Sequence, residues 1–314
     1  MKLNRIILVF CSGLLLYACQ NIDESTDLSQ QKFEEEIVYR NLDLPAIDVK
    51  SLNENARLAP SKYKAKLYMA EYITAPESEE MGRTVIFDNK GSKKLSIDFS
   101  PFEKLYETPD MSYYVDEFRA SSSVDVATAT AAIDRAAQTW DEVTCSELGL
   151  TKIDAIPLPI GIIANILGFP SIDGAIADVE HLGFMPAEFF DFLAPGGSNF
   201  ILGVTFTLIW IDDEGNPIDT NGDGKIDAAV REIYYNDNFP WADGATFDVE
   251  TVALHEMGHG LSQAHFGTAF IKKNGTVQFS PRAVMNASYS GVQTEIGKTD
   301  NAGHCSIWAN WPNK

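Results

Sequence analysis

The sequence contains the run Thr251-Val-Ala-Leu-His-Glu-Met-Gly-His-Gly-Leu-Ser-Gln-Ala-His265, which holds three of the chain's five histidines. On a helix, His255 and His259 are four residues apart, so they lie on one face and can hold a single ion. His265 reaches the same ion only if the helix ends and the chain turns back. Three imidazoles leave one tetrahedral position open, which is typical of a catalytic zinc rather than a structural one.

Glu256 follows His255 directly and is one step round the same helix. From there its carboxylate can reach a water in the open position. Zinc lowers the pKa of a bound water to about 7, and a nearby glutamate accepts the proton as the water attacks a carbonyl. The alternative is a buried helix that carries histidines by chance, but the third histidine at this offset makes such a match rare.

The run resembles the HExxHxxGxxH signature of the metzincin zinc endopeptidases. Ser262 stands where that signature has a glycine, which lets the chain turn out of the helix. A non-glycine residue at positive φ costs on the order of 1 kcal/mol. We therefore expect that Ser262 bears this strain or that the turn is made in another way.

A second segment, Pro281-Arg-Ala-Val-Met-Asn-Ala-Ser-Tyr289, resembles the methionine turn of the matrixins within this clan. The resemblance implies that Met285 lies beneath the zinc ligands and that Tyr289 lines the specificity pocket. The alternative for Met285 is an ordinary core methionine. The implied fold is α+β: a twisted mixed sheet with helices, a zinc-binding helix, the methionine turn and a small C-terminal subdomain, preceded by a small N-terminal region.

Other segments predict the elements around this site. Apolar residues recur at helical spacing over residues 125–143, which resemble the first helix of a matrixin catalytic domain. Residues 200–210 form a strongly apolar strand, and Arg231–Tyr235 resembles the edge strand along which metzincins bind substrate. Asp248 is placed to cap the zinc-binding helix. Residues 151–199 lie where matrixins are shorter, which indicates an insertion.

The N-terminal residues resemble a bacterial export signal. A basic start at Lys2 and Arg5 precedes an apolar stretch, residues 6–17, that is too short to span a membrane as a mature helix. The following Leu16-Tyr-Ala-Cys19 resembles a lipobox, which implies a signal peptide over residues 1–18 and lipidation of Cys19. The protein would then be exported and anchored to the bacterial outer membrane or cell surface. The alternative is plain secretion.

Residues 19–114 are expected to form a polar tether and an N-terminal region, which is either a small domain, an inhibitory pro-segment or both. Strand-like runs appear at Arg83–Phe87 and Lys94–Phe99. The stretch from Tyr63 to Phe118 has no cysteine, so it lacks the matrixin cysteine latch. The catalytic domain is expected over residues 115–314.

The loop Asp219-Thr-Asn-Gly-Asp-Gly-Lys-Ile-Asp227 copies the first part of a calcium-binding loop. Its expected ligands are side chains and one backbone carbonyl, at Asp219, Asn221, Asp223, Lys225 and Asp227. Val230 stands where a bidentate glutamate is expected, so a complete EF-hand is excluded. The alternative is a turn rich in Asp, Asn and Gly.

The chain has four cysteines. Cys11 belongs to the expected signal and Cys19 to the lipobox, so Cys145 and Cys305 remain. Two cysteines in an exported chain suggest one disulfide. The metzincin resemblance places them on the first and last helices of the catalytic domain, where they can lie close enough to bond. His181 and His304 are expected to be surface or packing residues.

Composition narrows the function. The formal net charge of −21 argues against nucleic-acid binding, which needs clustered Lys and Arg. The motifs favour a zinc-dependent endopeptidase that acts on protein or peptide substrates, with His255, His259 and His265 as ligands and Glu256 as general base. Two alternatives remain: a surface-binding lipoprotein whose protease site is silent or latent, and a zinc hydrolase acting on a non-peptide amide.

Overall fold

The computed structural model describes residues 37–42, 44–52, 63–76, 78–88, 96–100, 110–272 and 277–312. All of these residues belong to one compact unit. The expected signal peptide, Cys11 and the lipidation residue Cys19 lie outside the described residues.

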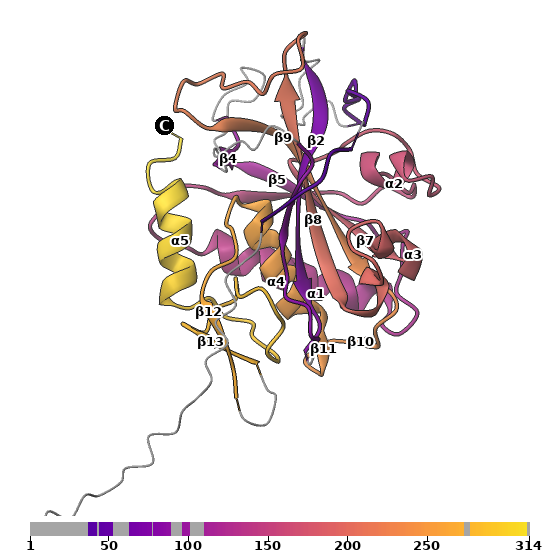
Figure 1. Ribbon diagram of the computed structural model, residues 1–314, viewed down its shortest axis with the longest axis vertical. Coiled ribbons are helices and arrows are strands. Elements are labelled where there is room, and N and C mark those ends of the chain that lie inside the picture. Colours follow the sequence, from indigo (N-terminus) through magenta and orange to yellow (C-terminus); the bar gives the residue numbers. More distant parts are fainter. Residues whose placement is uncertain are drawn as a thin grey trace, which may run out of the picture. The chain divides into compact units, whose positions relative to one another are not determined.

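A nine-stranded mixed sheet forms the centre of this unit (Figure 1). Its strands are β1 (Ile37–Tyr39), β2 (Lys64–Thr74), β3 (Thr84–Ile86), β4 (Ile97–Asp98), β5 (Met111–Val115), β6 (Leu150–Ile153), β7 (Val179–Met185), β8 (Ile201–Ile211) and β9 (Ile226–Asn236). They run in the order β1-β3-β2-β8-β9-β7-β5-β6, and β4 pairs with β9. Strands β9, β7, β5 and β6 are parallel, whereas β8 is antiparallel to both of its neighbours, β2 and β9.

The described residues also contain five α-helices, so the predicted α+β class is confirmed. They are α1 (Val126–Asp141), α2 (Ile162–Ile166), α3 (Ala187–Asp191), α4 (Val249–Gly260) and α5 (Lys298–Trp308). Helix α1 begins at the predicted place, because the Asp125 carboxylate accepts a hydrogen bond from the N–H of Thr128. Two short pairs complete the described part: β10 (Trp241–Ala242) with β11 (Phe247–Asp248), and β12 (Thr268–Ile271) with β13 (Val277–Ser280).

The sheet separates two apolar clusters, because side chains alternate between the faces of a strand. On β8, Leu202 and Ile209 belong to the cluster that contains α1 and α4. Val204, Phe206 and Leu208 belong to the cluster that contains α2 and α3. Helix α4 packs on β8, β9 and β2 and also against α1. The segment with the three histidines is therefore held between the sheet and α1.

The predicted edge strand at Arg231–Tyr235 is wrong. These residues lie in β9, which has β8 on one side and β7 on the other. All of β9 is buried, including Arg231. The charge of Arg231 is tolerated inside the sheet because its Nη1 donates to the backbone carbonyl of His259 at the end of α4. Strand β8 separates β9 from β2, which is the neighbour of β8 on its other side.

The boundary expected near residue 115 falls at the end of β5, which lies within the sheet between β7 and β6. Strands on both sides of this position are neighbours: β2 pairs with β8 from Lys64↔Ile211 to Thr74↔Ile201. Strand β3 then pairs with β2, and β1 pairs with β3. The described part of the N-terminal region thus shares one sheet with the residues expected to form the catalytic domain.

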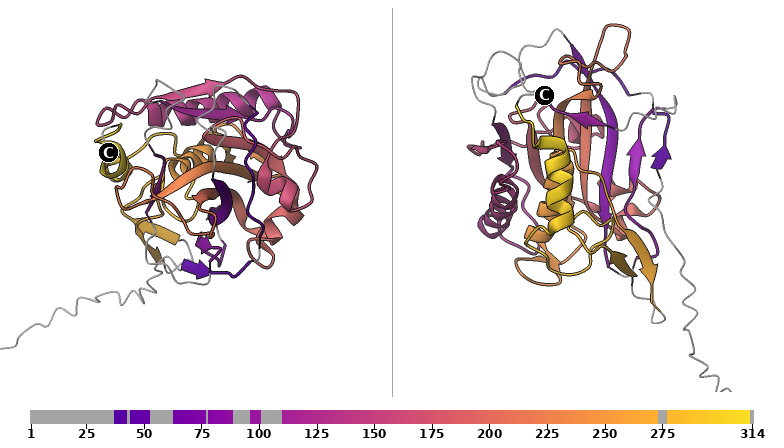
Figure 2. Two further views of the ribbon diagram at one scale, coloured as in Figure 1. Left: turned by 90° about the horizontal axis from the view of Figure 1, so that it is seen from above. Right: turned by 90° about the vertical axis from the view of Figure 1, so that its left-hand side faces the viewer.

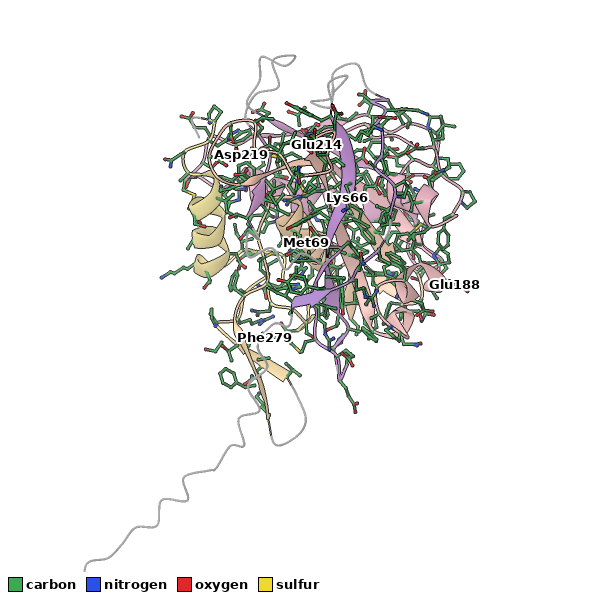
Figure 3. All side chains as sticks on the ribbon, turned by 45° about the horizontal axis from the view of Figure 1, so that its top comes forward. Lys66, Met69, Glu188, Glu214, Asp219 and Phe279 are labelled. Carbon is green, nitrogen blue, oxygen red and sulfur yellow. A yellow bond between two sulfur atoms is a disulfide. The ribbon has the colours of Figure 1, made fainter. Side chains whose placement is uncertain are left out.

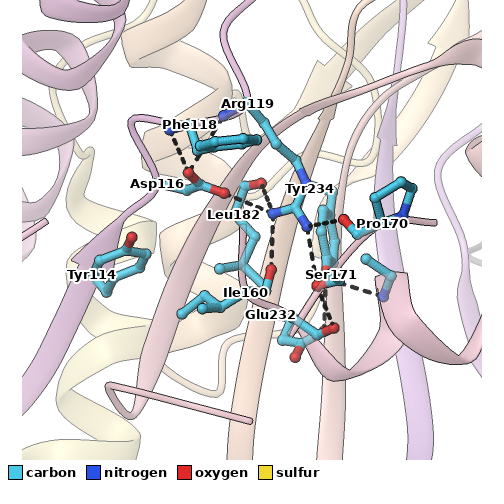
Figure 4. Close-up of polar contacts among 12 residues, drawn as sticks. Tyr114, Asp116, Phe118, Arg119, Ile160, Pro170, Ser171, Leu182, Glu232 and Tyr234 are labelled. Carbon is cyan, nitrogen blue, oxygen red and sulfur yellow. Dashed lines mark hydrogen bonds and ion pairs between the residues drawn. The ribbon is translucent and has the colours of Figure 1, made fainter. Parts of the chain in front are cut away.

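The expected insertion over residues 151–199 is fastened to the sheet by a buried polar network (Figure 4). Arg119 is its centre: Nη1 donates to the Asp116 carboxylate at 2.7 Å and to the carbonyls of Ile160 and Leu182. Its Nη2 donates to Ser171 Oγ at 3.1 Å. One guanidinium therefore links the end of β5, the α2 region and β7.

Two buried carboxylates also hold this region against the sheet. Glu232 accepts hydrogen bonds from the N–H groups of Ile162 and Ile163 and from the Tyr234 hydroxyl. Glu180 accepts two backbone bonds from the loop before β7. Burial raises the pKa of Glu232 to about 7, and burial together with the charge of Glu232 raises the pKa of Glu180 well above its usual range.

These raised pKa values predict the direction in which stability depends on pH. A carboxyl with a raised folded-state pKa binds more protons in the folded than in the unfolded state. The stabilisation from Glu232 is thus complete below its unfolded pKa near 4.5 and is lost as pH rises through about 7. We expect Glu232→Gln to flatten the pH dependence of the unfolding free energy across this window. Chemical denaturation at a series of pH values measures it, and an unchanged slope would contradict the assignment.

The structure pairs Cys145 with Cys305 in a disulfide, with their Cα atoms 5.8 Å apart. Cys145 follows the end of α1, and Cys305 lies on α5, which is drawn in yellow in Figure 2. Helix α5 also contacts the chain after α4, since Trp308 Nε1 donates to the Leu261 carbonyl at 2.9 Å. The C-terminal helix is thus tied to α1 covalently and to α4 by a hydrogen bond.

Loss of this disulfide should destabilise the fold strongly. The two cysteines are 160 residues apart, and in the chain-entropy model closing a loop of that length stabilises by about 5 kcal/mol. We expect Cys145→Ser with Cys305→Ser to lower the unfolding free energy by several kcal/mol, measured by denaturant titration. The same denaturation midpoint for the double variant and the oxidised native protein would refute this expectation.

Candidate metal centre

Helix α4 is built to hold its polar residues in the interior. The Asp248 carboxylate accepts the N–H of Thr251 at 2.9 Å, as predicted for the helix cap. All residues of α4 are buried, from Val249 to Gly260. A buried polar side chain needs partners, so the histidines and the glutamate of this helix must be satisfied within the protein.

The three predicted ligands converge. The Nε2 atoms of His255, His259 and His265 lie 3.1–3.2 Å from one another. Zinc–nitrogen distances of about 2.0–2.1 Å at tetrahedral angles place ligand nitrogens roughly 3.3 Å apart, so this spacing fits a zinc-sized ion. Among the described residues, these three form the one group of His, Cys, Asp or Glu side chains with ligand atoms near enough to share an ion.

The other ring nitrogens set the state of the two helical imidazoles. His255 Nδ1 lies 2.7 Å from the Val284 carbonyl, and His259 Nδ1 lies 2.7 Å from the Gln263 carbonyl. A carbonyl only accepts, so each Nδ1 carries the proton and each Nε2 keeps its lone pair. Burial, together with the charge of His265, also lowers the pKa of His255 to about 3. The rings are therefore neutral donors to a cation.

The turn that brings His265 back is made by Ser262. Its φ is 69°, the one positive φ at a non-glycine residue in the described part of the chain. Its N–H donates to the His259 carbonyl at 2.9 Å, and the Gln263 N–H donates to the Gly258 carbonyl at 3.0 Å. Of the two possibilities expected from the sequence, the structure shows the first: Ser262 itself adopts the strained conformation. The chain therefore reverses within a few residues.

The methionine turn lies directly against α4. A Cβ added to Gly258 would stand 2.3 Å from Met285 Sδ, so the methionine occupies the space that Gly258 leaves between the two helical histidines. Met285 is fully buried. Its N–H donates to Asp300 Oδ1 at 3.1 Å, and the Val284 N–H donates to Asp300 Oδ2 at 3.2 Å. One carboxylate of α5 therefore holds the turn whose carbonyl receives His255 Nδ1–H.

Tyr289 is buried at the start of α4. Its hydroxyl lies 3.3 Å from the N–H of Asp248 and 3.5 Å from the carbonyl of Ala245. Its backbone N–H donates to the Thr74 carbonyl, on β2, at 2.9 Å. The structure thus brings Tyr289 to the N-terminal end of the histidine helix and also joins its backbone to β2.

Glu256 faces β8 and is fully buried. Thr205 Oγ1 donates to Glu256 Oε2 at 2.6 Å, whereas Oε1 has no hydrogen-bond partner among the described residues. Burial raises the pKa of the Glu256 carboxyl well above its usual range. The hydrogen bond from Thr205 and the nearby N–H of Ile73 oppose this, and the charge of Glu71 adds to it. Oε1 remains available as an acceptor.

Three residues of this centre have no signal in the sequence motif. Thr205 lies in a strongly apolar strand. Asp300 lies in the first turn of α5, where an acidic residue is usual and suggests no special role. Glu71 lies in β2, far from the motif. Glu71 Oε2 lies 3.4 Å from His259 Nδ1, which already donates to the Gln263 carbonyl. Glu71 is buried and also meets Thr84 Oγ1 at 3.4 Å.

The predicted calcium loop forms a tight turn held by side-chain to backbone hydrogen bonds. Asp219 is labelled in Figure 3, in the loop between β8 and β9. Its carboxylate accepts the N–H groups of Gly222 and Gly224, and Asp223 accepts the N–H of Lys225. Calcium binding at Asp219, Asn221, Asp223, Lys225 and Asp227 stays a prediction.

The two remaining histidines are packing residues, which is one of the two roles expected for them; neither lies on the surface. His181 is buried, and its Nδ1 lies 2.6 Å from the Tyr235 hydroxyl. His304 is buried and stacks on Trp140 with ring centroids 5.7 Å apart. Neither belongs to the group of ligand atoms formed by the other three.

The comparison with known proteins adds no relative. No protein-family model matches the chain, and no curated protein matches it significantly in sequence. Within the described residues, none of the helices has the length and apolar character needed to cross a membrane.

Asp300 provides a test of how the centre is held. We expect Asp300→Asn to weaken zinc affinity about 10- to 100-fold, the usual cost of losing an outer-shell partner of a ligand. The physical reason is that the amide cannot accept from both Val284 and Met285, so the carbonyl that fixes His255 becomes loose. Competition with a chelator of known affinity measures the change. Asn301→Ala, on the exposed side of α5, is the matched control, and equal affinities in all three proteins would exclude this role.

Proposed function

We propose that the protein is a zinc-dependent endopeptidase of the metzincin type. The observation that carries the proposal is the convergence of three imidazole Nε2 atoms beside the buried carboxylate of Glu256. The tight turn at Ser262 and the methionine turn at Met285 support the metzincin resemblance, since both lie where its two sequence elements require them.

The fold gives further support to the same proposal. A mixed sheet carries α1 and α4 on one face, and a C-terminal helix lies beyond the methionine turn. These features agree with the twisted sheet, zinc-binding helix and small C-terminal subdomain expected from the resemblance. Tyr289, at the start of α4, is the residue proposed to line the specificity pocket.

His255, His259 and His265 would hold the zinc. The bound ion supplies Lewis-acid activation of a water and of the scissile carbonyl. Glu256 is the general base: its free Oε1 accepts the proton, and the same carboxyl then delivers it to the leaving amine. Thr205 fixes the other oxygen, Oε2, so that the carboxylate keeps one orientation.

An intact general base favours the enzyme over the alternative, a surface-binding lipoprotein with a silent site. A buried carboxylate is costly to keep unless it is used or fully satisfied, and Glu256 keeps one oxygen unpaired. The export signal and the lipid anchor at Cys19 remain part of the proposal for where the enzyme acts, on the cell surface or outside the cell.

The separate roles of ligands and base give the decisive experiment. We expect Glu256→Gln to retain one zinc per chain and to lose peptide hydrolysis about 10²- to 10⁴-fold, the range for removal of a general acid–base group. Glu250→Gln on the same helix is the control, because the Glu250 carboxylate pairs with Arg135 of α1 and not with the histidines. Hydrolysis of a quenched peptide library is measured with the intact chain and after limited digestion by a serine protease that is then inhibited. Protein without zinc, or a fully active Glu256→Gln variant, would refute the proposed function.

A further inference from the structure

A cavity of about 280 Å³ lies at the end of the β2–β8 pair that is remote from the histidines. Strands β2 and β8, the chain after β3 and the turn after β8 supply its walls, which are Lys66, Tyr68, Asp88, Ile209, Ile211, Gly215, Asn216 and Pro217. On β8, Ile209 follows Thr205, the partner of Glu256, by four residues. That separation is roughly 13 Å along a strand, so the cavity does not belong to the metal centre.

The base of the cavity is apolar and withdrawn from solvent. Ile209 is 1% exposed, Ile211 is 4% exposed and Tyr68 is 2% exposed. Tyr68 is the extra residue of a β-bulge in β2, between the paired residues Leu67 and Met69. A bulge interrupts the regular alternation of side chains and re-aims one of them, and here Tyr68 and Met69 both join the apolar cluster on the α4 side of the sheet. Such a base favours a ligand that carries an apolar group.

Two residues of opposite charge line the same cavity. Lys66, labelled in Figure 3, and Asp88 are both partly exposed, whereas the apolar residues of the base are buried. The charges therefore lie nearer to solvent than the base does. Lys66 and Asp88 do not form an ion pair with each other, and the Lys66 ammonium has no hydrogen-bond partner among the described residues. An ammonium offers three donors, so an anionic group of a ligand can pair with it.

The turn after β8 gives the cavity a preformed wall. The Gly215 N–H donates to the Asp212 carbonyl at 3.0 Å, and the Asn216 N–H donates to the Asp212 carboxylate at 2.7 Å. Ile211 and Pro217 then form an antiparallel bridge, which folds the turn back onto β8. A wall that is already ordered lowers the entropic cost of binding. The cavity therefore has the features of a built ligand site: fixed walls, an apolar base and a few polar groups.

We propose that this cavity binds a free amino acid with an apolar side chain, held as its zwitterion. The ligand carboxylate pairs with Lys66, and the ligand ammonium pairs with Asp88. Its side chain fills the base formed by Tyr68, Ile209 and Ile211. A neutral apolar molecule would leave both charges unused, and a dicarboxylate would bring an anion to Asp88.

The size of the cavity agrees with this class of ligand. Its volume of about 280 Å³ is near the lower limit of about 300 Å³ for small-molecule sites, which suits one amino acid better than a peptide. The site uses neither the zinc nor the general base. It is therefore independent of the proposed peptide hydrolysis.

Equilibrium dialysis of the full chain against radiolabelled leucine tests the site. We expect saturable binding of one leucine per chain with a Kd of about 1 mM or tighter. Lys66→Met should weaken binding about tenfold or more, because a hydrogen bond to a charged group is lost. Lys64→Met is the matched control, since it removes the same charge from an exposed residue of the same strand that does not line the cavity. Equal affinities in the two variants would overturn the proposal.

Changes to the ligand give a second measurement that needs no variant. Leucinamide lacks the carboxylate and N-acetylleucine lacks the ammonium, so each should compete with leucine about tenfold more weakly or worse. Glycine should also compete poorly, because it has no side chain to fill the apolar base. Absence of leucine binding, or competition by leucinamide as strong as that by leucine itself, would contradict the assignment.

A metal control separates this site from the histidine centre. Zinc can bind the amine and carboxylate of a free amino acid, so the dialysis is repeated with zinc-loaded and with chelator-treated protein. We expect the same leucine affinity in both. Leucine binding that disappears with the zinc would place the amino acid at the metal and overturn the proposal. A protein that binds leucine in this way but hydrolyses no peptide would support the cavity while refuting the endopeptidase.

Discussion

The centre depends on two hydrogen bonds from ring nitrogens to backbone carbonyls. Because Nδ1 of His255 and of His259 donates to Val284 and Gln263, both Nε2 lone pairs are directed to one point. Each carbonyl is in turn placed by something else. Val284 belongs to the turn that Asp300 holds from α5, and Gln263 follows the strained Ser262. The orientation of two imidazoles is thus the result of packing among α4, the methionine turn and the C-terminal helix.

Because the orientation of the imidazoles depends on this packing, the C-terminal helix affects the metal centre although it carries none of the ligands. Helix α5 carries Asp300 at one end and Cys305 further on, and the disulfide to Cys145 joins it to the end of α1. On its other side, α1 supports α4, since Trp140 Nε1 donates to the Leu254 carbonyl at 2.8 Å. The helices on this face therefore form a closed set of contacts around the histidine helix.

Local patterns predicted the parts of this structure that depend on local spacing. The separation of His255 and His259 follows from helical periodicity, and the buried residues of α1 follow from the same period. Pairings between distant segments gave no such signal. Residues 231–235 were expected at an edge because nothing local shows that β2 and β8 lie beyond them in the sheet.

We propose that three histidine nitrogens, and no other protein side chain, hold a zinc ion. X-ray absorption at the zinc edge of the purified full chain tests it most directly. The account predicts one zinc per chain with three imidazole nitrogens and one lighter oxygen-type neighbour at about 2.0–2.1 Å. A spectrum with sulfur ligands, a fourth imidazole, or substoichiometric metal after zinc loading would contradict it.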